Sequence, residues 1–302
     1  MNLPEEPLHL SAALARHAAT YLCRVDPETG ERCSWYHGLW QDLRVIGLAA
    51  SPERQAEFFL RSFAELAKRN RHQRVLISGA ADYSILACVL WACAKNGVQA
   101  EVTVVDRCDT PLFLNKWYAE RAGCEIATVM SDILDYQPSA PFDMICSHSF
   151  LGQFPHPKRP QLVEKWSQLL APGGAVLVVN RLRPDLGPKE VRFSPEEARA
   201  FRSKVAQRIG RLTDLSAHDR QQIVRRTGIY VERSQTYALS SEELLALFAG
   251  NGFQIDHVSS IISSDPQNRD ISGKAIPKDA QHACLLARKP EEDVPTGIKF
   301  SP

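Results

Sequence analysis

Residues 74–106 read RVLISGAADYSILACVLWACAKNGVQAEVTVVD, and this stretch decides the fold class. A short apolar segment (74–78) leads into a helical segment that ends at Asn96-Gly97, and a second apolar segment (101–106) follows. Glycine directly after the last helical residue marks a helix end. Strands as apolar as these two are buried on both faces, which is typical of a parallel sheet with helices between its strands. The stretch therefore predicts a β–α–β unit.

The same alternation continues to residue 182. We expect strands at 125–130, 142–149 and 175–180, with helices over about 110–123 and 160–170 between them. Two last strands are predicted at 253–262 and 283–288. The fold class is therefore α/β, with a doubly wound, mostly parallel seven-stranded sheet, and such sheets bind ligands beyond the carboxyl ends of their strands.

The segments outside this alternation read as helical. We expect residues 1–70 to form an N-terminal helical lid or substrate-capping segment, residues 71–290 the α/β core, and residues 291–302 a loose tail. Within the core, residues 183–240 form a helical insertion after the fifth strand. Ser51-Pro52-Glu53 has the composition of a helix start, and Ser194 and Ser240 each begin a capping box with a glutamate three residues later.

Composition limits the classes of partner. The 302 residues carry 36 Lys and Arg against 35 Asp and Glu, so the formal net charge of +1 does not favour nucleic acid as a partner. The N-terminus lacks the pattern of a signal peptide. The apolar run 85–94 is about half of the roughly 20 residues that a membrane span needs. We therefore expect a cytoplasmic protein with a small-molecule substrate and neither nucleic acid nor a membrane as partner. The oligomeric state stays open, a homodimer included.

Eight cysteines occur in the chain, and none forms a C-x-x-C pair. Zinc sites usually draw ligands from pairs at short spacing. We therefore expect buried free thiols in a reducing compartment and predict no metal site.

Small or polar residues follow each of the first four strands. The turn Ser78-Gly79-Ala80-Ala81-Asp82 would let a ligand approach the backbone, although it lacks the G-x-G-x-x-G fingerprint of dinucleotide binding. Asp106 ends the second strand, where a carboxylate can accept hydrogen bonds from both hydroxyls of a ribose. Asp132 follows the third strand, and Ser147-His148 ends the fourth. Each feature alone is equally compatible with ordinary turns and helix packing.

Together these features resemble the class I S-adenosylmethionine-dependent methyltransferases, from about residue 74 to residue 288. The resemblance rests on the stretches VLISGAADYS, VTVVDRCD, MSDIL, MICSHSFLG and LLAPGGAVLVV. It implies a Rossmann-like methyltransferase fold whose last strand is antiparallel, and S-adenosylmethionine as cofactor.

The resemblance also implies roles for single residues. Ser78, Gly79, Ala80 and Ala81 would face the methionine part of the cofactor, and Asp106 its ribose. Asp132 would accept from the adenine amine, with Ile133 and Arg107 beside the ring, and Ser147 and His148 would lie under the sulfonium.

One departure from the family pattern concerns the cofactor's amino group. The family usually has an acid where Ile77 stands, and Asp82 is the candidate replacement. Because of this departure, a second hypothesis stays open: an S-adenosylmethionine-dependent enzyme that does not methylate, such as an azetidine-carboxylate type cyclase or an aminocarboxypropyl transferase. A third hypothesis is a cofactor-binding protein without catalysis.

Candidate catalytic residues are His148, Tyr36 and His37. Imidazole titrates near neutrality, so His148 is a candidate general base, with a hydrogen-bonding role as the alternative. Tyr36 and His37 lie in the aromatic cluster 35–40, which reads either as helix packing or as part of a lid over the cofactor. Arg225 and Arg226 in the insertion read either as a solvated helix face or as a site for an anionic acceptor.

Overall fold

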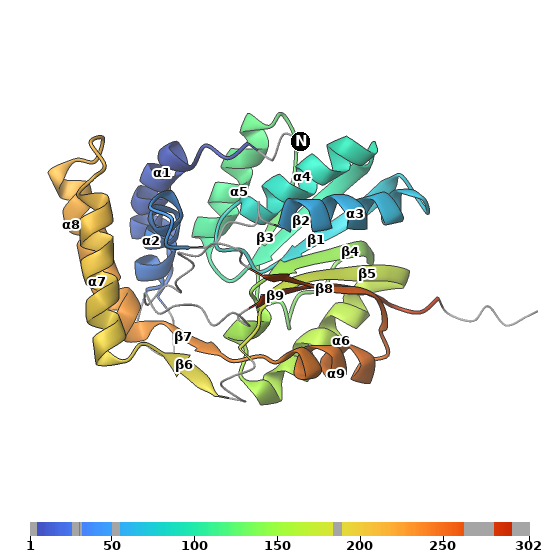
Figure 1. Cartoon of the computed structure of the whole chain (residues 1–302). Helices are drawn as coiled ribbons and strands as arrows, with labels where there is room; N and C mark the ends of the chain where they lie inside the picture. The colour runs from blue at the N-terminus through green and yellow to red at the C-terminus, as the bar shows by residue number, and fades with distance from the viewer. Residues whose placement is uncertain are drawn as a thin grey trace, which may run out of the picture.

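The computed structural model describes residues 5–25, 30, 32–49, 55–183, 189–262 and 281–291. Its centre is a seven-stranded sheet in the order β3-β2-β1-β4-β5-β9-β8 (Figure 1). The first five strands of that order run parallel, and β9 is antiparallel to both of its neighbours. The strands span His72–Ser78 (β1), Gln99–Asp106 (β2), Ala127–Met130 (β3), Phe142–His148 (β4), Leu170–Arg181 (β5), Gln254–Ile262 (β8) and Gln281–Arg288 (β9). The predicted fold class is confirmed, including the antiparallel last strand.

The central strand β1 shows why this sheet forms. Val75, Leu76 and Ile77 are fully buried, and Ile77 lies in register with Val104 of β2 and Cys146 of β4. Apolar side chains that alternate between the two faces need a helical layer on each face. The strong apolar signal of the sequence therefore reports burial on both sides.

Helices cover the two faces of the sheet (Figure 1). The first face packs against α3 (Ala56–Ala67), α4 (Ser84–Asn96) and α5 (Asp109–Arg121), and the second against α6 (Arg159–Leu169) and α9 (Ser241–Gly250). Helix α4 ends at Gly97 in the left-handed conformation, and the Val98 N–H donates to the Cys93 carbonyl at 2.9 Å. Helix α3 belongs to this packing, so the helices of residues 1–70 serve two different layers.

A separate helical layer stands beside the sheet (Figure 1). It contains α1 (Leu8–Leu22) and α2 (Ser34–Val45), which contact each other, and the insertion helices α7 (Pro195–Ile209) and α8 (Ala217–Arg233). Helix α2 packs against α8, and a short antiparallel pair of strands, β6 (Glu190–Arg192) and β7 (Gln235–Tyr237), closes the insertion. We call α1 and α2 the lid helices. The 3-10 turns η2 (Leu151–Gln153) and η3 (His156–Lys158) complete the described elements.

The two predicted capping boxes differ in outcome. Ser194 and Glu197 form a full reciprocal box at the start of α7. Ser240 accepts from the Glu243 N–H at 3.1 Å, but the Glu243 carboxylate binds Arg159 and His156 instead. The helix start at residues 51–53 and the tail after residue 291 lie outside the described residues. No helix in the described part of the chain is long and apolar enough to cross a membrane.

Candidate functional site at the carboxyl ends of the strands

The turn after β1 is built around Gly79. Its φ of +74° lies in the left-handed region, and its N–H donates to the Val105 carbonyl at 3.0 Å. A Cβ at this position would lie 2.6 Å from Cδ2 of Phe150, so the phenylalanine ring rests directly on the glycine. Phe150 follows Ser149, a non-glycine residue with φ of +54°, a conformation that costs energy and is common at functional sites. Phe150 was not predicted as a site residue, because its only signal in the sequence is its position after the polar end of β4.

Asp106 ends β2 and is oriented by two backbone N–H groups. Ala80 donates to its Oδ2 at 3.0 Å and Cys108 donates to its Oδ1 at 2.9 Å. Burial raises the pKa of Asp106, while His37 and the two N–H donors oppose that shift. A carboxylate has about four acceptor positions, so about two remain for a ligand.

Arg107 follows Asp106 directly, and its Nε lies 3.7 Å from Oδ2 of Asp132. The other oxygen of Asp132 accepts from the Leu134 N–H at 3.0 Å. The Ser131 N–H donates to the Asp106 carbonyl at 3.0 Å, which joins the ends of β2 and β3. Ile133 packs into the core and is only 3% exposed, so its side chain lies beneath this surface.

The hydroxyl groups of Ser78 and Ser147 are both engaged in the core. Nε1 of Trp166 donates to Oγ of Ser78 at 2.9 Å, and Oγ of Ser147 donates to the Ser78 carbonyl at 3.0 Å. Both serines are buried. These bonds fix the ends of β1 and β4 to each other and to α6, so the two hydroxyls position the turn. Of the predicted turn residues, Ala81 is more exposed than Ala80.

Asp82 is buried and faces the lid. Its Oδ2 accepts from Nη1 of Arg44 at 2.9 Å and from Nε2 of Gln41 at 3.4 Å, and its Oδ1 accepts from the Ser84 N–H at 2.9 Å. Burial alone would raise the pKa of Asp82, but Arg44 holds it below its usual range. Arg44 also pairs with Glu6, ahead of α1. In this arrangement Asp82 anchors α2 to the turn, a role that neither Gln41 nor Arg44 signalled in the sequence.

His148 stacks on His282 of β9, with ring centroids 6.2 Å apart. Among the described residues its Nε2 has no hydrogen-bond partner, although that atom is buried. Burial, His282 and Arg44 lower the pKa of His148 to about 3. The imidazole is therefore neutral at physiological pH, and its Nε2 can either accept or donate one hydrogen bond, depending on the tautomer. Asn180 at the end of β5 likewise has a buried, unpartnered Oδ1 within the described part of the chain, and the sequence analysis missed it.

The lid brings Tyr36 toward the same strand ends. Its ring stacks on Tyr230 of α8 at 6.5 Å and lies 5.3 Å from Trp40. Burial raises the pKa of Tyr36 well above its usual value, and the nearby charges of Asp82 and Asp106 add to this shift. Tyr36 therefore stays protonated as a hydrogen-bond donor near both carboxylates. The side chain of His37 faces Cys23, with its Nδ1 3.6 Å from Sγ of that residue.

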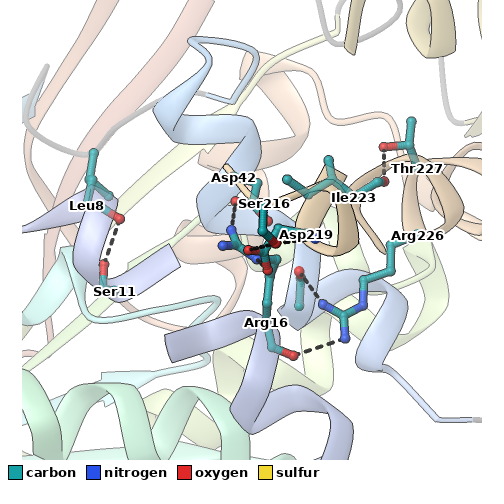
Figure 2. Close-up of polar contacts among 10 residues, drawn as sticks. Leu8, Ser11, Arg16, Asp42, Ser216, Asp219, Ile223, Arg226 and Thr227 are labelled. Atoms are coloured by element: carbon teal, nitrogen blue, oxygen red, sulfur yellow. Dashed lines mark hydrogen bonds and ion pairs between the residues drawn. The ribbon is translucent and has the colours of Figure 1, made fainter. Parts of the chain in front are cut away.

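Arg226 of the insertion is used inside the protein. It donates to the carbonyls of Gly38 and Arg16 at 2.9 and 3.0 Å and to Oγ1 of Thr20 at 3.1 Å. Figure 2 shows Arg226 and the neighbouring Arg16–Asp42 ion pair between helices α1, α2 and α8. The guanidinium of Arg226 therefore fastens α8 to the lid helices, and the side chain also lines the cavity between α1 and α8.

A cavity of about 640 Å³ lies between α1 and α8, on the far side of the lid helices from Asp82 and Asp106. Arg225 contributes to its wall. None of the predicted cofactor-binding residues lines it, so the cavity does not define the candidate site.

Comparisons with known proteins agree with this geometry. Residues 87–174 match the family model described as a methyltransferase domain. An S-adenosylmethionine-dependent methyltransferase from Clostridium acetobutylicum aligns at 10% identity over 82% of this chain and 96% of its own, with a TM-score of 0.50. The [4+2]-cyclase SpnF aligns at 16% identity over 81% of this chain and 84% of its own, also at 0.50.

A Burkholderia thailandensis 1,6-didemethyltoxoflavin-N1-methyltransferase aligns at 16% identity over 96% of this chain and 94% of its own, with a TM-score of 0.49. No curated protein sequence matches the chain significantly. The sheet order is that of the Rossmann-like class I methyltransferase fold, and the match to a methyltransferase domain covers residues 87–174 of its central part.

Proposed function

We propose that the protein is an S-adenosylmethionine-dependent methyltransferase that acts on a small-molecule acceptor. The observation that carries the proposal is Asp106, a half-buried carboxylate held by two N–H donors with about two acceptor positions left over. Those positions suit the two hydroxyls of a ribose, which is the role that the family resemblance implies.

The residues around Asp106 fit the rest of this cofactor. The absence of a Cβ at Gly79 leaves the turn in contact with an aromatic ring, and ring faces attract cations such as a sulfonium. Asp132 has acceptor positions beyond the one that the Leu134 N–H uses. The unpartnered Nε2 of His148 supplies one more polar contact in the same region. When bound, S-adenosylmethionine supplies an electrophilic methyl group.

This chain's own residues would position the reactants. The lid helices, fastened by Arg44–Asp82 and by Arg226, exclude water from the strand ends and hold Tyr36 as a protonated donor. Alignment of acceptor and methyl group supplies much of the rate in such a displacement. A base with a pKa near 3 removes protons poorly, so His148 would orient the reactants by hydrogen bonding.

A second candidate function rests on a specific observation. Ile77 is fully buried, and Asp82 is committed to Arg44, so neither offers a carboxylate to the cofactor's amino group. An amine without such a partner is more easily deprotonated and more nucleophilic. This favours cyclisation, in which the amine attacks Cγ, the nitrogen–Cγ bond forms, and the sulfur–Cγ bond breaks with methylthioadenosine as the leaving group.

Product analysis separates the two functions. Methyl transfer leaves S-adenosylhomocysteine and needs an acceptor, whereas sulfur–Cγ cleavage leaves methylthioadenosine, and cyclisation needs the cofactor alone. We expect S-adenosylhomocysteine when purified protein is incubated with S-adenosylmethionine and candidate metabolites, with products read by mass spectrometry. If methylthioadenosine forms without an acceptor, faster than the cofactor decays spontaneously, the proposed function would be cyclisation and not methyl transfer. No turnover despite tight cofactor binding would favour a non-catalytic protein.

A further inference from the structure

Three cysteines and one histidine come together between the lid and the sheet. Cys23 follows α1, Cys33 precedes α2, His37 lies in the first turn of α2, and Cys108 lies between β2 and α5. Their candidate ligand atoms all lie within 4.8 Å of one another. The group was not predictable from the sequence because its members come from three separate segments, with Cys108 far along the chain from the others.

The spacing of these atoms matches four ligands of one metal ion. Sγ of Cys108 lies 3.5 Å from Sγ of Cys33 and 3.6 Å from Sγ of Cys23, and Nδ1 of His37 lies 3.6 Å from Sγ of Cys23. Tetrahedral zinc has Zn–S bonds of about 2.3 Å and Zn–N bonds of about 2.0 Å, which put its ligand atoms roughly 3.5–3.8 Å apart. These three separations agree with those values within a few tenths of an ångström, and the other three are no longer than 4.8 Å.

The surroundings of the cluster also suit a metal ion. Cys23 and Cys108 are 1% and 4% exposed, and His37 is 8% exposed. Cys33 is half-buried, so three of the four groups are shielded from solvent and the fourth lies at the edge of the site. Oγ1 of Thr110 lies 3.1 Å from Sγ of Cys23, where a hydroxyl can donate to a thiolate. The N-terminus of α5 adjoins Cys108, and a helix N-terminus stabilises a thiolate. Cysteine pairing explains the group less well, because a disulfide between any two of the three thiols would leave the third alone.

We propose that Cys23, Cys33, His37 and Cys108 bind one Zn²⁺ ion in a closed structural site. The ion would join the end of α1 and the start of α2 to the segment that follows Asp106. Because the Cys108 N–H donates to Asp106, the metal would also fix the turn that carries the proposed ribose ligand. The zinc site does not depend on which bond of the cofactor the enzyme breaks.

Metal analysis of the untagged, full-length protein tests the proposal. We expect about one zinc per chain by elemental mass spectrometry after purification under reducing conditions, because a site with four protein ligands holds its ion tightly. Cys108→Ser and Cys23→Ser should bind zinc more weakly than the parent protein. A competing chelator should remove their zinc at a concentration at least about a hundredfold lower than the parent requires. Cys124→Ser is the matched control, since Cys124 is a half-buried free thiol outside the cluster and should leave the zinc content unchanged.

A second measurement uses the unaltered chain and does not depend on how the variants fold. Exchange of zinc for Co²⁺ should give the intense visible absorption of tetrahedral, thiolate-bound cobalt, and X-ray absorption at the zinc edge should fit three sulfur ligands and one nitrogen. Protein that holds no more zinc than Cys108→Ser, or cobalt with a spectrum of oxygen ligands only, would overturn the proposal. So would a disulfide between Cys33 and Cys108 in protein kept under reducing conditions.

Discussion

Asp106, as a single residue, has two roles in hydrogen bonding, one within the protein and one toward the proposed ligand. Its oxygens accept from Ala80 and Cys108 within the protein, and the proposal assigns its remaining acceptor positions to a ribose. Asp106→Asn replaces one acceptor oxygen by an NH₂ donor. We expect S-adenosylmethionine to bind about ten- to a hundredfold more weakly, because each charge-assisted hydrogen bond lost costs about 1.5–3 kcal/mol.

Calorimetric titration checks this value. Asp214→Asn is the control, since Asp214 is an exposed carboxylate of the insertion that hydrogen-bonds only its neighbour Thr213 in the described contacts. Unfolding curves without ligand show whether Asp106→Asn keeps its fold. A folded variant that binds the cofactor as tightly as the parent would remove Asp106 from the site.

His148 gives a prediction about pH. Its pKa is lowered to about 3 in the folded protein, against about 6.5 for an ordinary histidine. Between these values the unfolded chain binds more protons, so the contribution of His148 to stability is present above pH 6.5 and is lost as the pH falls toward 3. Against His148→Gln, the parent should lose roughly 1 kcal/mol of unfolding free energy between pH 6.5 and 5.5. Urea unfolding at several pH values measures this, and a constant difference between the two proteins would mean an ordinary pKa.

At the scale of elements, the packing of α2 against α8 requires a residue without a side chain at position 38, which is Gly38. A Cβ there would lie 2.6 Å from Nη1 of Arg226 and 2.7 Å from its Cζ. We expect Gly38→Ala to displace the guanidinium from its three acceptors and to lower the free energy of unfolding by about 1–3 kcal/mol. Gly228→Ala is the matched control within α8, because nothing lies within 4 Å of a Cβ there. Replacing a helical glycine by alanine should stabilise by about 0.5–1 kcal/mol, and thermal unfolding that ranks the two variants in the opposite order would contradict the role of Arg226.

The helices and strands also show which features of the structure can be predicted from the sequence. The strands were predictable because an all-apolar run such as 75–77 has few places in a protein other than a two-sided sheet. The position of Asp106 was predictable because parallel strands put their carboxyl ends at one edge. Arg226 was not, since an arginine that binds carbonyls of another helix has the same local sequence as one on a solvated face. The thiol cluster was hidden for a related reason: only the tertiary fold brings Cys108 to the start of α2.

The whole molecule consists of a sheet with its two helical layers and a lid that apolar packing and a few polar contacts hold at its edge. Ala15 of α1 packs in one cluster with Tyr83, Ala87 and Leu114 of the core. Arg44 joins α2 to Asp82 of the core, and Arg16 joins α1 to Asp42 of α2 and to Asp219 at the start of α8. Buried ion pairs hold a geometry without adding much stability. The lid helices should therefore open at lower free energy than the sheet.

This difference predicts how the cofactor changes hydrogen exchange across the molecule. A ligand held between lid and sheet slows opening of the lid by the factor 1 + [L]/Kd, which is about a hundredfold at a hundred times Kd. We expect amide exchange in α2 (Ser34–Val45) to slow by up to this factor when S-adenosylmethionine is added. Helix α9 (Ser241–Gly250), which packs on the sheet away from the lid, is the internal control and should change much less. Mass spectrometry measures the exchange in both helices. If exchange slows equally in α2 and α9, the cofactor stabilises the molecule as one unit. If exchange in α2 does not change, the cofactor does not bind under the lid helices.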